Sequence, residues 1–336
     1  MLSVSEALSE QDAIGIGRKG TIDNPYILKA PFWTVDTLFY CVPKNTDIDF
    51  VYALYQTINW RSMDESTGVP SLSKTAINAV DIYVPSREEQ KRIGETFNQL
   101  DSIITLHQRK CDELKNYKKG MLQKMFPQPG ETKPQVRFPG FTEDWEQRKL
   151  GDIVDRVTRK NTNLESKLPL TISAQYGLID QMEFFGKRIA SHDISGYYLL
   201  NKGEFAYNKS TSGDAPWGAV KRLDRYENGA VSTLYITFAI KNNEETDTDF
   251  LASYYDTNLW HKGIQAVAAE GARNHGLLNI APSDFFDTTL MMPKTVEEQQ
   301  AIAKTITSVS NLITLHQRKC DELKEYKKGL LQNMFV

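Results

Sequence analysis

The sequence predicts an α+β protein made of two unequal copies of one unit, each a globular domain followed by a long helix. Three observations predict this: a repeat at an offset of 209 residues, a coiled-coil spacing at the end of each copy, and mixed strand and helix patterns before it. The 336 residues are enough for about two domains of ~100–200 residues. With 40% apolar and 25% charged residues, the chain has the composition of a globular protein.

The repeat is clearest near the end of each copy. Residues 105–115 return letter for letter at 314–324, and residues 117–120 return at 326–329. A short-period solenoid would repeat more often along the chain. The pattern therefore indicates one large unit used twice.

An apolar run that ends in proline precedes each long helix, at residues 82–85 and 290–293. We expect each run to be a strand that stops at its proline, because proline cannot continue a central strand. The acidic residues at Glu88 and Glu297 suit the first turn of a helix. Both long helices are therefore expected to begin there.

The two long helices carry a seam of residues spaced alternately by three and four. Such a narrow seam needs a partner helix, and the obvious partner is the helix of the other copy. About 39 residues at ~1.5 Å each give a rod of roughly 58 Å. The packing residues are Phe97, Leu100, Ile104, Cys111 and Leu114 in the first helix, and Ile306, Val309, Ile313, Cys320 and Leu323 in the second.

Two polar positions interrupt both seams identically, His107 with His316 and Lys118 with Lys327. They either fix the register or contact a partner, or they are a histidine at the seam edge and a lysine that extends its ammonium to solvent. The sequence leaves both interpretations open.

Composition also sets the domain boundaries. Residues 127–140 are rich in proline and glycine and predict a linker. The predicted order is a partial domain over 1–86, a helix over 87–126, the linker, a domain over 141–294 and a helix over 295–335. In the second domain we expect a short amphipathic segment at 152–157, strands at 170–173, 204–207, 219–223 and 232–240, and a helix over 250–260.

The first domain matches only the back half of the second. If the second copy begins near residue 141, the offset of 209 puts the start of the first copy about 68 residues before Met1. A late start codon, a split gene or a recombined allele would explain this. We expect exposed apolar strand edges in the first domain and poor solubility of the chain alone.

Several classes of site are disfavoured. Three cysteines without a CxxC pair predict neither a disulfide framework nor a zinc site, and they suit a reducing cytoplasm. Asn24-Pro25-Tyr26 has one proline too few for the base-stacking motif of adenine methyltransferases, and there is no Walker motif. The five histidines form no HExxH or HxH, which disfavours a metal site. No apolar run approaches the ~18–20 residues of a membrane span.

The repeat resembles the specificity (S) subunit of Type I restriction–modification enzymes. The motifs that carry the resemblance are Phe141–Trp145 with Lys149–Asp152, Tyr207–Ser210, Pro293 with Glu297–Gln300, and Leu323–Lys324 with Lys327–Gln332. No single motif is decisive, but their order, doubled, is specific, and the resemblance covers essentially the whole chain.

The resemblance implies two target-recognition domains, the first one truncated, separated by two long helices that form an antiparallel coiled-coil spacer. It implies a non-catalytic subunit that binds a split double-stranded DNA target in the cytoplasm and docks modification (adenine methyltransferase) and restriction subunits. S-adenosylmethionine, ATP and Mg would be bound only by those partners. The short first domain raises the prospect of a truncated or silent allele. The alternatives are a coiled-coil scaffold that binds no DNA, or a self-sufficient methyltransferase or nuclease.

The net charge of −3 argues weakly against DNA binding, but what matters is where the cations lie. Reading DNA needs cations for phosphates and amide or forked side chains for base edges. Polar loops that supply both are the candidates, although such loops are also common as solvated surface. The candidate residues, in these loops or just beyond them, are Arg18, Lys19, Lys187, Arg188, Asn208, Lys209, Ser210, Lys221, Arg222, Arg273 and Asn274. The basic face of the first helix, including Lys115, Lys118, Lys119 and Lys124, is either solvated or in contact with DNA or an acidic partner.

Overall fold

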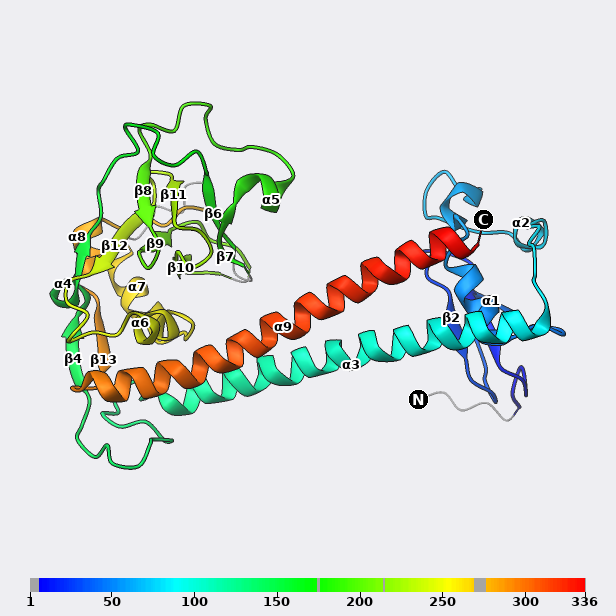
Figure 1. The fold of residues 1–336 in the computed structure, drawn as a ribbon, viewed down its shortest axis with the longest axis horizontal. Coiled ribbons are helices and arrows are strands. Elements are labelled where there is room, and N and C mark those ends of the chain that lie inside the picture. The colour runs from blue at the N-terminus through cyan, green and yellow to red at the C-terminus, as the bar shows by residue number, and fades with distance from the viewer. Residues whose placement is uncertain (1–5, 174–175, 214, 269–275, 336) are drawn as a thin grey trace. The chain divides into compact units, whose positions relative to one another are not determined.

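The computed structural model of the chain describes residues 6–173, 176–213, 215–268 and 276–335 (Figure 1). It divides into two compact units: unit 1 is 1–113 with 313–336, and unit 2 is 114–312. The long helices α3 (Arg87–Met125) and α9 (Val296–Met334) each contribute to both units. In the described part of the chain, no helix has the length and apolarity that a bilayer crossing requires.

Unit 1 contains a three-stranded antiparallel sheet in the order β2-β1-β3. Its elements are β1 (Ala13–Gly17), β2 (Tyr26–Leu28), β3 (Leu38–Cys41), α1 (Ile48–Tyr55), the 3-10 helix η1 (Trp60–Met63) and α2 (Lys74–Asn78). Ile14 and Ile16 from β1 and Phe50 from α1 lie in its core. The Asp47 side chain caps α1 by accepting a hydrogen bond from the Phe50 amide (3.1 Å).

Unit 2 is built around a four-stranded antiparallel sheet in the order β10-β9-β12-β5, with three further strand pairs, β11-β8, β13-β4 and β6-β7. Phe205 and Phe238 stack in its core at 5.1 Å between ring centroids. The strands are β4 (Glu146–Lys149), β5 (Val154–Arg156), β6 (Leu170–Ser173), β7 (Gly177–Asp180), β8 (Tyr198–Asn201), β9 (Phe205–Asn208), β10 (Ala219–Arg222), β11 (Asn228–Val231), β12 (Ile236–Ile240) and β13 (Thr289–Met292). The helices are α4 (Leu150–Ile153), α5 (Gln181–Phe185), α6 (Thr248–Tyr255), α7 (His261–Val267) and α8 (Pro282–Phe286).

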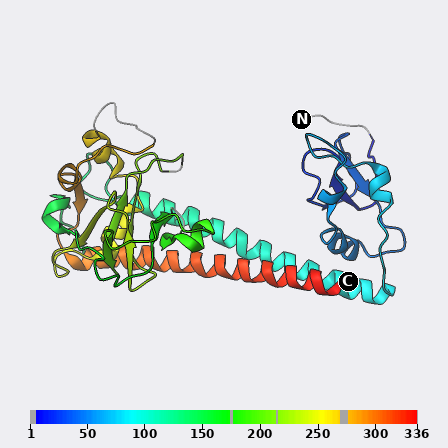
Figure 2. The same cartoon turned by 90° about the horizontal axis from the view of Figure 1, so that it is seen from above.

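Within unit 1, α3 and α9 lie side by side and antiparallel (Figures 1 and 2). The His107 and His316 Nδ1 atoms are 2.9 Å apart. On one side of this pair the Cys111 Sγ is 3.6 Å from the Gln317 side-chain oxygen, and on the other side the Cys320 Sγ is 3.7 Å from that of Gln108. Since Cys111 and Cys320 are related by the repeat, as are the two glutamines, the helix pair has a local twofold symmetry at the histidines. The predicted packing of the two helices on each other is confirmed.

The polar residues that interrupt the seam make contacts within the chain, and whether they fix the register stays open. The histidines meet each other across the helix pair. The Lys118 ammonium binds Asp256 (2.7 Å) in unit 2, and the Lys327 ammonium binds Gln56 (2.7 Å) and Asp101 in unit 1. The repeated lysines therefore tie each helix to a globular domain.

The end of each long helix packs into the domain of the other copy. Phe126, at the end of α3, belongs to the core of unit 2 and stacks on Phe250 at 5.5 Å. Phe335, just after α9, lies 5.5 Å from Phe50 in unit 1. The two pairs are equivalent by the repeat, so each helix joins its own copy to the other one.

One strand prediction is wrong. The run at 290–293 forms β13, which pairs with β4, but residues 82–84 form no strand. The physical reason is that no described segment offers residues 82–84 the backbone partner that β4 offers β13. Ile82 is 44% exposed and Val84 is 48% exposed, so this run lies at the surface.

Candidate nucleic-acid interface

Unit 2 joins α3, β10 and α6 through one carboxylate. The Lys118 and Lys221 ammonium groups each lie 2.7 Å from an oxygen of Asp256, the residue that ends α6. Burial alone would raise the pKa of Asp256, but the two neighbouring ammonium groups outweigh it and lower this pKa below its ordinary value. Asp256 therefore stays ionised and holds both lysines in place.

A groove of about 910 Å³ surrounds these two ion pairs, which we call the lysine tether. Five lysines and one aspartate contribute its formal charges, so its surface is strongly positive even though the whole chain is not. The charged lining residues are Lys115, Lys118, Lys119, Lys124, Lys221 and Asp256. Lys119 and Lys124 are exposed and form no ion pair with the described residues, which leaves their charges available to an anion.

His261, the first residue of α7, also lines the groove. Burial lowers its pKa from the ordinary value of 6.5, so the imidazole is neutral at pH 7. It can therefore donate or accept a hydrogen bond but adds no charge. His261 could not be selected from the sequence, because its position in the groove depends on the fold of α6 and α7.

Of the predicted site residues in unit 2, Lys221 lies in the groove, whereas Arg222 points elsewhere. The Arg222 guanidinium is largely buried and binds Asp224 (2.6 Å) and Asp249 (2.5 Å). It thereby links β10 to α6, and its N–H groups are directed at these two carboxylates. Arg222 is thus paired within the described residues, and its contact with DNA stays a prediction.

The loop after β9 holds three other predicted residues. The Asn208 side chain accepts a hydrogen bond from the Ser210 amide (3.0 Å), which shapes the turn. The Lys209 ammonium points inward toward the Ile280 carbonyl (3.4 Å), and burial lowers its pKa. Lys209 thus stands partly withdrawn from solvent, while Ser210 is exposed.

Lys187 and Arg188 follow α5 and are exposed. The Arg188 guanidinium donates hydrogen bonds to the Ser191 carbonyl (2.9 Å) and the His192 carbonyl (3.1 Å), so it braces its own loop. Neither residue lines the lysine groove. Arg273 and Asn274 lie outside the described residues.

In unit 1, Arg18 and Lys19 occupy a tight turn directly after β1 and both are exposed. A Cβ atom at Gly17 would lie 1.9 Å from the Thr21 carbonyl, and Gly20 has φ +92°, so this turn depends on its glycines. The stretch from Gly15 to Gly17 is strand rather than loop. The Arg18 guanidinium lies 5.7 Å from the centre of the Phe39 ring, and it donates to the Asp36 carbonyl (3.3 Å).

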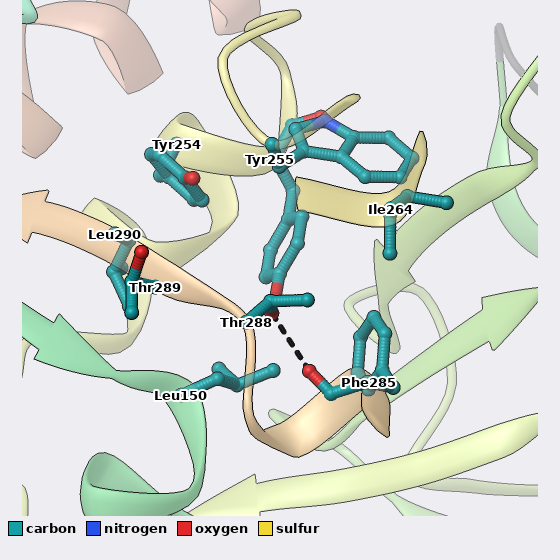
Figure 3. A pocket seen from close by; sticks show the side chains of 9 residues that line it. Leu150, Tyr254, Tyr255, Ile264, Phe285, Thr288, Thr289 and Leu290 are labelled. Carbon is teal, nitrogen blue, oxygen red and sulfur yellow. Dashed lines mark hydrogen bonds between the residues drawn. The ribbon is translucent and has the colours of Figure 1, made fainter. Parts of the chain in front are cut away.

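A second hollow in unit 2 is apolar and almost filled (Figure 3). Its volume is about 10 Å³, roughly that of one water molecule, and Tyr255 and Phe285 project into it. The Thr288 hydroxyl donates to the Phe285 carbonyl (2.7 Å) at its edge. This hollow is therefore a packing defect of the core and not a substrate pocket. Among the described residues, no cluster of three or more His, Cys, Asp or Glu side chains could hold a metal ion.

Comparison with known proteins agrees with a protein that recognises DNA. Residues 3–116 and 142–325 match the Type I restriction modification DNA specificity domain. The chain is 23% identical over 346 residues to the Type I restriction enzyme MjaVIII specificity subunit of Methanocaldococcus jannaschii, covering 96% of this chain and 75% of that protein.

The fold agrees with solved structures. The Type I restriction–modification S subunit from M. genitalium has a TM-score of 0.60 at 13% identity, over 99% of this chain and 85% of its own. A chain from a structure of type I R-M complex assembly and conformational transition has a TM-score of 0.51 at 14% identity, over 99% of this chain and 84% of its own.

The matched residues cover well over half of the sequence, so the chain belongs to the Type I restriction–modification DNA specificity family. It is a specificity subunit that recognises a DNA target and is itself non-catalytic. In this family the cofactors belong to the modification and restriction subunits. The fold is that expected of the family, with two long helices in contact as the spacer.

Proposed function

We propose that the lysine groove of unit 2 holds the sugar–phosphate backbone of one half of a split double-stranded DNA target. The observation that carries this is the excess of five lysines over one aspartate in a single groove of a chain with net charge −3. Phosphate contacts fix the position of a protein on the duplex without reading sequence. Neighbouring loops would then read the base edges.

The loop after β9 is the best candidate for base reading in unit 2. Asn208 and Ser210 offer amide and hydroxyl groups of the kind that pair with base edges. Lys221 lies at the groove itself, next to Asp256. In unit 1, the exposed Arg18 and Lys19 in the turn after β1 would contact the backbone of the other half of the target.

The remaining roles follow from the family. The chain would work in the cytoplasm, where its three free cysteines stay reduced. Its paired helices would dock modification subunits, which carry S-adenosylmethionine, and the restriction subunits, which carry ATP and Mg, would join that core. The DNA specificity of the whole complex would thus depend on a subunit without chemistry of its own.

The salt dependence of DNA binding tests the groove. In the chain assembled with its modification subunit, the double substitution Lys119→Ala with Lys124→Ala is expected to lower the slope of log K against log salt by about 0.9 per lost phosphate contact, roughly 1.8 in total. The matched control is Lys202→Ala with Lys294→Ala, which removes two exposed lysines of unit 2 outside the groove. Equal slopes for the two double variants would contradict the proposal.

A further inference from the structure

In unit 2, a segment that crosses the start of α9 is held by one buried carboxylate. The Arg137 guanidinium donates two hydrogen bonds to Glu298 (2.7 and 2.8 Å), and the Trp145 indole N–H donates a third (3.2 Å). The Trp145 ring packs edge-on against Phe126 (5.9 Å) and Phe250 (5.8 Å). The strand β4 follows directly and pairs with β13.

The start of α3 in unit 1 makes the same backbone contacts as the start of α9 in unit 2. The Gln90 amide donates to the Pro85 carbonyl (2.8 Å) and its oxygen accepts from the Asp47 backbone N–H (3.1 Å). Gln299 makes the two equivalent bonds in unit 2, at 3.2 and 2.8 Å. The glutamate before each glutamine, Glu89 or Glu298, is therefore set on its helix in the same way.

The pair of stacked phenylalanines beneath Trp145 in unit 2, here called the aromatic platform, also has a counterpart in unit 1. There, among the described residues, it has no tryptophan on top. Phe335 lies on Phe50 at the same centroid distance, 5.5 Å, as Phe126 on Phe250. Phe126 is 1% exposed because Trp145 covers it, whereas Phe335 is only partly buried. The described aromatic rings recorded against Phe335 are those of Phe50 (5.5 Å) and Phe97 (6.0 Å), and neither is a counterpart of Trp145.

The charged and apolar parts of this site in unit 1 are equally open. Glu298 is 2% exposed, whereas Glu89 is exposed and forms no ion pair with any described residue. Leu290 in β13 is 4% exposed, whereas its counterpart Ile82 is 44% exposed. Tyr83, at the centre of the unpaired run, is 93% exposed. Unit 1 thus has a carboxylate, an aromatic platform and a strand-like edge together, all without an occupant.

We propose that this surface, formed by Ile82–Val84, Glu89 and Phe335 and called here the open socket, binds an extended segment of a second polypeptide. The segment would carry an arginine for Glu89, a tryptophan eight residues later for the Phe335 platform, and a strand directly after it. An unpaired edge accepts such a strand through backbone hydrogen bonds, and the side chains give specificity. The arginine matches the charge of Glu89, as Arg137 matches that of Glu298.

A second copy of this chain is a poor occupant. Its own segment of this type is already bound to Glu298 and paired with β13. Moving it to the open socket of another copy would uncover an equivalent surface in unit 2, with no net gain in contacts. The partner that we propose is a different polypeptide with a free segment of the same type as residues 137–149.

A labelled peptide with the sequence of residues 134–152 tests the socket on the full chain. We expect saturable one-to-one binding by fluorescence anisotropy, and slower hydrogen exchange at residues 82–84. Glu89→Gln in the protein, or Arg137→Gln in the peptide, should weaken binding at least about tenfold, because each removes one charge of the pair. The matched control is Glu88→Gln, which should leave binding unchanged, since its counterpart Glu297 is exposed in unit 2.

If the free peptide binds weakly, the same segment can be fused to the chain itself. The full chain extended after Phe335 by a second copy of residues 127–152 should show exchange at residues 82–84 slowed at least about tenfold by the high effective concentration. Glu89→Gln should reverse this slowing, and Glu88→Gln should not. The proposal is overturned if neither the peptide nor the fused segment protects these amides, or if Glu89→Gln has no effect on the binding or protection observed.

Discussion

The starts of the two long helices form two similar sites that differ in how completely they are covered. At the start of α9, Glu298 is buried and binds Arg137 and Trp145, and β4 covers the edge of β13. At the start of α3, Glu89 is exposed and the run 82–84 stays unpaired. The glutamines that follow, Gln90 and Gln299, make the same hydrogen bonds in both places.

The contacts at the helix starts and the formation of the preceding strand therefore have separate causes. The glutamine contacts are local, so they form in both copies. The strand needs a partner from elsewhere in the chain, so a similar apolar run gives β13 in one copy and irregular backbone in the other. Substitutions at equivalent positions should therefore have unequal effects at the covered site and equal effects in the shared helix pair.

The largest difference in destabilisation between equivalent substitutions is expected at the two phenylalanines that follow the long helices. Phe126→Ala should lower the free energy of unfolding of unit 2 by about 4 kcal/mol, because it opens a cavity beneath Trp145 and Phe250. Phe335→Ala should lower that of unit 1 by less than about 2 kcal/mol, since this ring is partly exposed. Native-state hydrogen exchange reports each unit separately, and equal losses would contradict the comparison.

The next effect concerns the carboxylates. Glu298→Ala should destabilise unit 2 by about 3 kcal/mol, because it leaves the guanidinium of Arg137 without its buried partner. Glu89→Ala, the equivalent change in unit 1, should stay within about 0.5 kcal/mol of the parent protein. The same exchange experiment measures both, and a large loss for Glu89→Ala would show that this carboxylate already has a partner.

A smaller difference is expected in how acid affects the contacts of Lys118 and Lys327. The pKa of Asp256 is lowered in the folded protein, so its stabilisation is complete above the ordinary value of 3.8 and is lost as the pH falls through the lower folded value. Asp256→Asn should destabilise unit 2 by about 2 kcal/mol at pH 7 and remove this contribution to acid unfolding. Gln56, at the equivalent place in unit 1, binds Lys327 without a charge to titrate. An unchanged acid-unfolding profile in Asp256→Asn would exclude the tether as its cause.

The smallest differences should occur in the helix pair. Cys111 and Cys320 are both fully buried and make matching contacts on either side of His107 and His316. Cys111→Ser and Cys320→Ser should each destabilise unit 1 by about 1 kcal/mol, because a hydroxyl replaces a thiol in an apolar seam. Urea unfolding should give the two values within about 0.5 kcal/mol of each other. A clear inequality would mean that the local symmetry does not extend to energetics.

The helices and the repeat could be predicted from the sequence because their patterns are local and occur twice. The strands at 170–173, 204–207, 219–223 and 232–240 were found to within a few residues, as was the helix at α6. The strands β7, β8 and β11 were not, because each is short and is defined by a neighbour distant in sequence. The failed strand at 82–84 has the same origin.

The site was harder to predict than the fold. A basic residue looks the same in the sequence whether its charge is free or paired, so Arg222 was selected although it binds Asp224 and Asp249. The lysine groove brings α3 and β10 together with α7, and only the fold places Lys124 and His261 on one surface. Whether Arg18, Lys19, Asn208 or Ser210 touches DNA stays a prediction.

Sequencing of methylated adenines tests whether this chain sets the DNA target of a Type I complex. The chain would be expressed together with its modification subunit in a host without other adenine methylation. We predict methylation at one split sequence motif, absent when the chain is omitted and weakened by Lys119→Ala with Lys124→Ala. Methylation that is independent of the chain, or that follows no motif, would show that the chain does not set the target.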